Sequence, residues 1–201
     1  IEDGIISQMV ALPSNMFITV TLPATLWFFD KAKKNKDEIL FIDARNISTQ
    51  VDRALRKFSE EQIKNLSIIT RLYEGDSESF HNLIREYENS RDNSETEEEK
   101  KYFQEQIDWL LERFPEGKYE DVVGLCKVAK LEGEDGIIDQ DYSLNPGRYV
   151  GVVIEDDGMT AEEFKEEIFG LNEEFKKLNK EAKELEEKIE ENLDKLVIEY
   201  E

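Results

Sequence analysis

The first 57 residues place their apolar side chains in short continuous runs, which is typical of β-strands. Three runs occupy residues 5–12, 25–29 and 39–42, and Pro13 and a Lys-rich connection lie between them. Aromatic and β-branched runs bounded by turn formers predict strands buried on both faces. The short connection between the second and third runs favours an antiparallel pair of these two strands.

These strands cannot form a domain alone, because an isolated hairpin is marginally stable in water and both faces need cover. The sequence also begins with Ile1 rather than Met, close to the first apolar run. We therefore interpret the chain as a C-terminal piece of a larger protein, cut within a domain that contains a sheet.

Beyond the strand region the apolar residues recur every three or four positions, which predicts helices. Ser59 and Gln62 form a capping-box pattern ahead of the first helix. A second helix is marked by the apolar residues Phe80, Leu83, Ile84 and Tyr87. The polar residues 88–99 are predicted to be an exposed loop or linker, and a third helix runs from about residue 95 to residue 113. A short extended segment and an Asn-Pro-Gly turn are predicted between this helix and residue 150.

The C-terminal residues predict one long helix with an apolar seam. A capping-box pattern, Thr160 with Glu163, precedes apolar residues that alternate spacings of four and three, the heptad pattern of a coiled coil. At 1.5 Å per residue the helix is about 60 Å long. The seam needs a partner, which is the other helices of the chain, another protein or a second copy. The seam comprises Phe164, Ile168, Leu171, Phe175, Leu178, Ala182, Leu185, Ile189 and Leu196.

Charge divides the chain near Lys57. Residues 1–57 carry 8 Lys or Arg against 7 Asp or Glu, and residues 58–201 carry 18 against 41, so the net charges are +1 and −23. We predict three parts, with strands in 1–57, a helical region with a connector in 58–150 and the long helix in 151–201. The acidic parts should repel a phosphate backbone, so most of their surface should not contact nucleic acid.

The residues with reactive side chains are few. Cys126 is the single cysteine and lies in an apolar segment, which favours a buried structural role and an intracellular, cytoplasmic location. His81 stands alone and is interpreted as a surface or packing residue rather than a ligand. No apolar run is long enough to span a bilayer, which predicts a soluble protein without a membrane partner.

Motifs for catalysis and for metal binding are absent from these 201 residues. The prolines at 13, 23, 115 and 146 are isolated, so no Asn/Asp-Pro-Pro-aromatic sequence occurs, and no phosphate-binding glycine loop or metal-ligand spacing is present. The acidic pairs fall on polar helix faces, which favours a solvated surface over acid/base catalysis. We assign no catalytic residue and no metal ligand to this chain.

Five segments together resemble one family, the modification (DNA methyltransferase) subunit of type I restriction-modification systems. They occur in the family's order and span most of the chain. The segments are LPSNMF at 12–17, LPATLWFFDK at 22–31, ILFIDAR at 39–45, GLCK at 124–127 and YSLNPGRYV at 142–150.

This resemblance implies a parent enzyme that transfers a methyl group from S-adenosylmethionine to adenine N6 in a bipartite DNA site. The fold implied is mixed α and β, with the terminal strands of a Rossmann-like methyltransferase sheet followed by helices and a long coiled-coil helix. The methyl-donor loop and Asn-Pro-Pro-Phe would precede Ile1, so no cofactor is expected on this piece. The seam would bind the DNA-specificity subunit, in a complex that also holds the restriction subunit and DNA.

Phe17 is the one candidate contact with the substrate. By position alone it is either a core-capping residue or a contact at a strand end. Enzymes that modify adenine extrude the base and stack it on aromatic side chains, and in the resembled family the aromatic of this motif often serves in that way. The resemblance therefore implies that Phe17 stacks on the target base.

Two other classes of function remain open from the residues. The seam could self-associate, which would make the chain a homo-oligomeric structural protein unrelated to methylation. The charge would also suit an acidic mimic of DNA, although residues 1–57 are nearly neutral and rich in strands. Tight self-association would indicate the structural protein, and inhibition of a DNA-binding enzyme would indicate the DNA mimic.

Overall fold

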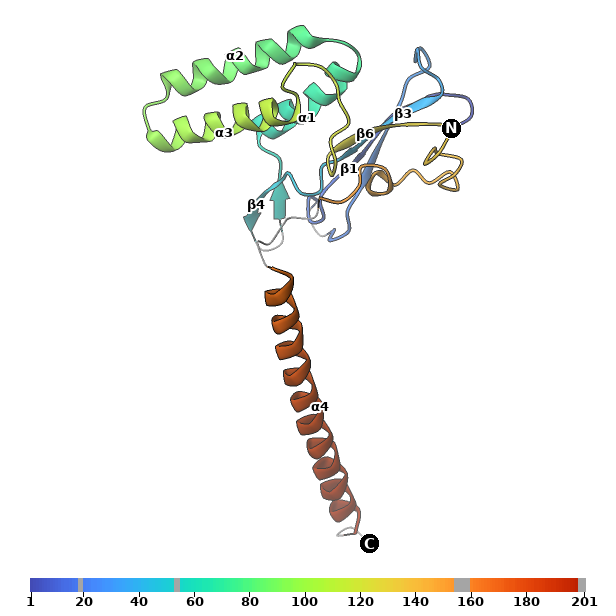
Figure 1. Ribbon diagram of the computed structural model, residues 1–201, viewed down its shortest axis with the longest axis vertical. Coiled ribbons are helices and arrows are strands. Elements are labelled where there is room, and N and C mark those ends of the chain that lie inside the picture. Colours follow the sequence, from blue (N-terminus) through green and yellow to red (C-terminus); the bar gives the residue numbers. More distant parts are fainter. Residues whose placement is uncertain (18–19, 53–54, 154–159, 199–201) are drawn as a thin grey trace. The chain divides into compact units, whose positions relative to one another are not determined.

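The computed structural model describes residues 1–17, 20–52, 55–153 and 160–198 (Figure 1). The chain divides into two compact units, residues 1–153 and residues 154–201. The change of net charge at Lys57 does not coincide with this division. The strands are β1 (Ile6–Ala11), β2 (Thr25–Phe29), β3 (Glu38–Asp43), β4 (Thr49–Asp52), β5 (Leu55–Lys57) and β6 (Cys126–Lys130). The helices are α1 (Glu60–Tyr73), α2 (Ser77–Asn93), α3 (Glu97–Arg113), the short 3-10 helix η1 (Pro146–Arg148) and α4 (Ala161–Ile198).

The first unit is built on a mixed four-stranded sheet with the order β2-β1-β3-β6. β1 is parallel to β3, with Met9 opposite Phe41, and each of these central strands has an antiparallel edge strand as its other neighbour. β6, which lies in the segment predicted to be extended, therefore belongs to the same sheet as the N-terminal strands. β4 and β5 form a separate two-stranded hairpin.

The predicted antiparallel pair of the second and third runs is wrong, because β1 lies between β2 and β3. Parallel strands cannot be joined by a tight turn, so the chain passes through β2 before it returns as β3 alongside β1. Burial on both faces is correct for β3, whose residues 39–43 are all buried. It is wrong for β2, an edge strand exposed along its whole length, with Phe29 61% exposed.

Helix α1 begins at the predicted capping box. The Gln62 backbone N–H donates to Ser59 Oγ at 3.2 Å, and the Gln62 side-chain oxygen accepts from the Ser59 N–H at 2.9 Å. The buried face is formed by Ile68, Ile69 and Leu72, whereas Ile63 in the first turn is 56% exposed.

The predicted loop at residues 88–99 is wrong. α2 continues to Asn93 and α3 begins at Glu97, so only a short turn with the N-cap Thr96 separates them. The polar residues lie on exposed helix faces, where charge does not oppose helix formation, and acidic residues near a helix N-terminus are stabilising. Arg91 also links the two helices by donating from Nη1 to the Gln104 side-chain oxygen at 2.6 Å.

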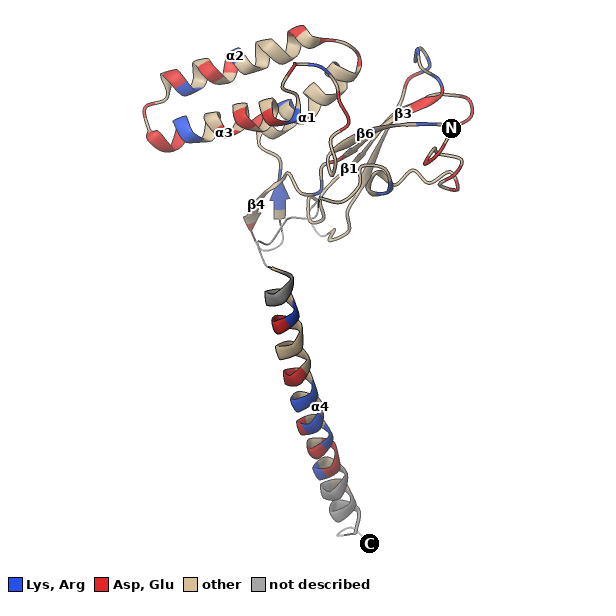
Figure 2. Ribbon diagram, viewed as in Figure 1, with Lys and Arg blue, Asp and Glu red and all other residues tan. Residues whose placement is uncertain are grey.

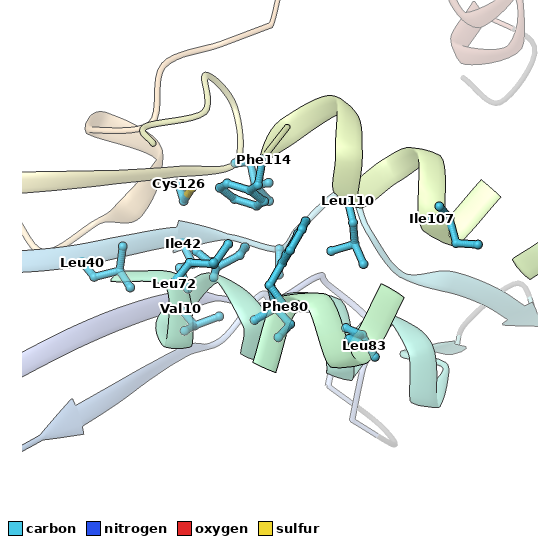
Figure 3. Packing of buried hydrophobic residues seen from close by; sticks show 14 of the residues in the cluster. Val10, Leu40, Ile42, Leu72, Phe80, Leu83, Ile107, Leu110, Phe114 and Cys126 are labelled. Atoms are coloured by element: carbon cyan, nitrogen blue, oxygen red, sulfur yellow. The ribbon is translucent and has the colours of Figure 1, made fainter. Parts of the chain in front are cut away.

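The sheet is covered on both faces. One face packs against the three helices through a single apolar cluster, in which Val10, Leu40 and Ile42 of the sheet lie near Leu72, Phe80 and Leu110 of the helices (Figure 3). The other face is covered by residues before and after η1, where the Tyr149 ring stacks on Phe41 with centroids 4.0 Å apart. Residues after α3 thus complete the core around β3.

The second unit consists of α4, a helix of 38 residues. Seven seam side chains are between 51% (Ile168) and 63% (Phe175) exposed, and Ala182 is exposed as well. The side chains of Glu163 and Leu196 lie outside the described residues. The long helix is therefore present, and its pairing as a coiled coil stays a prediction. The seven seam residues are Phe164, Ile168, Leu171, Phe175, Leu178, Leu185 and Ile189.

A buried polar network joins the three helices and can be tested. The Tyr87 hydroxyl donates to Asn65 Oδ1 at 2.9 Å, and Asn65 Nδ2 donates to Gln106 Oε1 at 3.0 Å. Asn65 is 2% exposed, so Tyr87→Phe leaves its oxygen without that donor and should lower the free energy of unfolding by about 1–3 kcal/mol. Urea unfolding of the chain measures this value.

Tyr102→Phe is the matched control. The Tyr102 hydroxyl bonds to Ser59 and Glu61 at the surface, and the residue is 36% exposed. Tyr102→Phe should change the free energy of unfolding by less than about 0.5 kcal/mol. Equal effects of the two substitutions would contradict a special role for the buried network.

Candidate functional site

The segments that follow β1 and β3 meet at one edge of the sheet. Because these strands are parallel, residues 12–17 and residues 43–45 leave the sheet at the same carboxyl edge. The Ala44 N–H donates to the Ala11 carbonyl at 2.9 Å, and the Leu12 N–H donates to the Ala24 carbonyl at 2.8 Å. Three of the five segments that carry the resemblance therefore lie side by side.

The other two segments, residues 124–127 and 142–150, come much later in the sequence and reach the same edge. The Asp43 N–H donates to the Leu125 carbonyl at 2.7 Å, and the Gly124 N–H donates to the Val150 carbonyl at 2.7 Å. Gly147 lies so close to Arg45 that an added Cβ would be 2.7 Å from Nη2. The fold thus gathers residues that are about a hundred positions apart in the sequence, which no local pattern predicts.

An ion pair fixes the end of β3. Arg45 donates from Nε to Asp43 Oδ1 at 2.9 Å and from Nη2 to Oδ2 at 2.5 Å. Asp43 is 8% exposed, so its buried carboxylate is satisfied by a two-point contact of the kind that orients a guanidinium strongly. The hydrogen bond to Asp43 raises the pKa of the Arg45 side chain above its ordinary value.

A pocket of about 560 Å³ lies at this edge. Its wall combines the Trp27 and Tyr142 side chains with the Arg45 guanidinium and the Asn145 amide, so it can receive a planar group that also accepts hydrogen bonds. Sequence reasoning did not find it. The lining residues are Ala11, Pro23, Ala24, Thr25, Trp27, Arg45, Tyr142, Ser143, Leu144 and Asn145.

Phe17 ends the segment 12–17, which leaves the sheet at this edge. It is not among the residues that line this pocket. It is 49% exposed, and its carbonyl accepts from the Val20 N–H at 3.1 Å. A half-exposed ring held at a strand end is available to a partner, so its role as a base platform stays a prediction.

An apolar groove opens beside β2, between the sheet and α1. It has a volume of about 650 Å³ and is lined by Leu26 and Phe28 of β2, by Met16 and by Ile63 of α1, among others. Leu26 and Phe28 are 43% and 41% exposed. A patch of this size on an edge strand is typical of a surface that another element covers.

Cys126 is buried and His81 lies at the surface, as predicted. Cys126 is buried, and burial raises the pKa of its thiol to about 11. His81 is exposed, and its Nδ1 lies 2.6 Å from the Ser77 carbonyl. Within the described residues no cluster of His, Cys, Asp or Glu could hold a metal ion, and none of the described helices could cross a membrane.

Residues 1–88 match the family model of N-6 DNA methylases. The chain is 32% identical over 198 residues to the type I restriction enzyme MjaIX methylase subunit of Methanocaldococcus jannaschii, covering 98% of this chain and 28% of that protein. It is also 32% identical over 179 residues to the HindI methylase subunit of Haemophilus influenzae, covering 88% of this chain and 31% of that protein.

A solved type I methyltransferase subunit from Streptococcus thermophilus aligns with 76% of this chain and 21% of its own length, with a TM-score of 0.42 and 18% identity. The chain spans less than a third of the length of the two curated relatives, at 28% and 31%. The sequence matches extend over nearly all of this chain, through strands and helices alike. Over nearly all of its length the chain is therefore similar to the methylase subunits of type I restriction enzymes.

Proposed function

We propose that this chain is the C-terminal part of the modification subunit of a type I restriction-modification system. The parent protein transfers a methyl group from S-adenosylmethionine to adenine N6 in a bipartite DNA site, together with a specificity subunit and a restriction subunit in the cytoplasm. The observation that carries the proposal is the 32% identity over 98% of this chain to a type I methylase subunit.

The catalytic groups of the parent lie outside these 201 residues in this proposal. The four prolines are isolated and no glycine-rich loop follows a strand, so we assign no residue of the chain to the methyl donor. The exposed edge of β2 and the apolar groove beside it support a continuation of the sheet, because an uncovered apolar edge strand favours aggregation.

The gene itself tests this arrangement. We expect the open reading frame upstream of Ile1 to encode a glycine-containing donor loop and then Asn-Pro-Pro-Phe or a close variant. In the whole protein, amide hydrogen exchange of residues 25–29 should then be slow, because a further strand would protect this edge. A start codon at Ile1, or fast exchange at β2 in the whole protein, would contradict the proposal.

Phe17 is proposed to stack on the extruded adenine. Its ring is 49% exposed at the carboxyl edge of β1, where Ala44 and Arg45 also leave the sheet. Stacking of one base on an aromatic side chain contributes about 1–3 kcal/mol. The free energy of the extruded state therefore depends directly on this ring.

Phe17→Ala in the whole methylase should lower the rate of adenine methylation roughly 5- to 150-fold, the range that the loss of one stacked base gives. Phe17→Tyr should retain most of the activity, because it keeps an aromatic face. Incorporation of labelled methyl groups into DNA measures the rate. Leu22→Ala, a 71% exposed residue of the same region, is the control, and an equal loss there would argue against stacking.

The seam of α4 is proposed to pack on a long helix of the specificity subunit. Its described large apolar residues are more than half exposed, and the heptad spacing places them on one stripe. Burying a Leu side chain contributes about 1.5–3 kcal/mol, so nine seam positions can hold two subunits together.

Leu178→Glu with Leu185→Glu should abolish co-purification with the specificity subunit or weaken binding roughly 100-fold or more, because two charges would be buried in the seam. Truncation before Thr160 should do the same and leave methyl-donor binding by the whole protein intact. Lys176→Gln with Lys183→Gln makes the same change of net charge off the seam and should have little effect.

The seam variants also test the alternative that the helix self-associates. Analytical ultracentrifugation of the chain would show a tight homodimer that is lost with the seam variants if the coiled coil pairs with itself. Normal co-purification of the truncated protein with the specificity subunit would reject the docking proposal.

A further inference from the structure

The hairpin β4–β5 carries positive charge in an acidic protein. Residues 49–57 contain three Lys or Arg and a single Asp, whereas residues 58–201 have a net charge of −23. Figure 2 shows β5 in blue, while acidic residues are frequent on α2 and α3. The positive charge of the hairpin should therefore attract a polyanion, whereas the acidic surface should repel it.

The cations of this hairpin are free to bind. Arg56 and Lys57 form no ion pair with the described residues, in contrast to Arg45, which is held by Asp43. β4 is exposed along its length, Lys57 is exposed and Arg56 is half-buried. Unpaired charges in an acidic chain are not explained by stability, since nearby carboxylates could have neutralised them.

The hairpin is fixed beside the loop that carries Phe17. The Arg56 N–H donates to the Asn15 carbonyl at 2.8 Å. Its other strand is tied to α1, because Gln62 Nε2 donates to Thr49 Oγ1 at 3.2 Å and to the Ile47 carbonyl at 2.5 Å. The cations therefore keep a set position relative to residues 12–17.

The lysines of residues 31–36 are a weaker candidate. The acidic residues Asp30, Asp37 and Glu38 flank them, and Lys33 donates to the carbonyls of Ile6 and Glu38. They also follow the opposite end of the sheet, after β2 and before β3. The structure thus favours the β4–β5 hairpin.

We propose that the β4–β5 hairpin binds the phosphate backbone of DNA next to the extruded adenine, through Arg56 and Lys57. This inference rests on the proposed function and adds a DNA-contacting element to it. Neighbouring residues on a strand point to opposite faces, so the two cations flank the ribbon on both sides. A two-stranded ribbon fits the major groove of B-DNA, where phosphates lie along both walls.

The test compares the whole methylase, assembled with its specificity subunit, with the variant Arg56→Gln/Lys57→Gln. Fluorescence anisotropy with a duplex of arbitrary sequence is recorded between 50 and 200 mM NaCl. Each phosphate contact contributes about 0.9 to the slope of log K against log salt, so the slope should fall by about 1.8. Binding should weaken roughly 200-fold at 50 mM and roughly 20-fold at 200 mM, since the effect vanishes near 1 M salt.

Lys101→Gln/Lys118→Gln is the charge-matched control. Both lysines are exposed, at 80% and 70% of their side chains, and lie on the acidic surface, so this variant should bind DNA like the unchanged protein. In methylation assays the hairpin variant should raise KM for DNA and leave kcat unchanged, because phosphate contacts position the duplex.

The outcomes separate the two proposals. Normal methylation with an unchanged salt slope in the hairpin variant would overturn the hairpin inference and leave the proposed function standing. Loss of the specificity subunit from the hairpin variant, with DNA binding by the remaining complex unchanged, would show a protein interface instead and also overturn it. A whole protein that transfers no methyl group to DNA would reject the proposed function itself.

Discussion

The parallel pairing of β1 with β3 is the constraint on which the rest of the first unit depends. Met9 and Phe41 are paired and fully buried on one face of the sheet, and Val10 and Ile42 are paired and buried on the other, so apolar packing on both faces fixes the register. Parallel strands end at the same edge. Every segment that contributes to the candidate site, from residues 12–17 to residues 142–150, is positioned relative to that edge.

Completion of the core by late residues explains why the first unit extends to residue 153. β6 pairs with β3, and Tyr149 stacks on Phe41, so the sheet is incomplete without segments that follow the helices. The hydrogen bond from Gly124 to Val150 and the close approach of Gly147 to Arg45 hold these late segments against the sheet. Packing and the candidate site are therefore made by the same residues.

Three surfaces are left for partners, and they differ in chemistry. The groove beside β2 is apolar and suits a continuation of the sheet, the seam of α4 suits another helix, and the β4–β5 hairpin is cationic and suits phosphate. The remaining helical surface is strongly acidic and should repel DNA. This division of surfaces suits the function proposed above, in which the chain is part of a larger assembly on DNA.

The sequence by itself determined the strands β1, β2, β3 and β6, the capped start of α1, the long helix α4 and the buried state of Cys126, because hydrophobic period and capping are local properties. It misplaced the partner of β3 and the loop at residues 88–99, since strand order depends on distant segments and exposed charge is compatible with a helix. The pocket at Trp27 and Arg45 and the placement of the hairpin beside Asn15 were decided only by tertiary contacts, which join residues far apart in the chain.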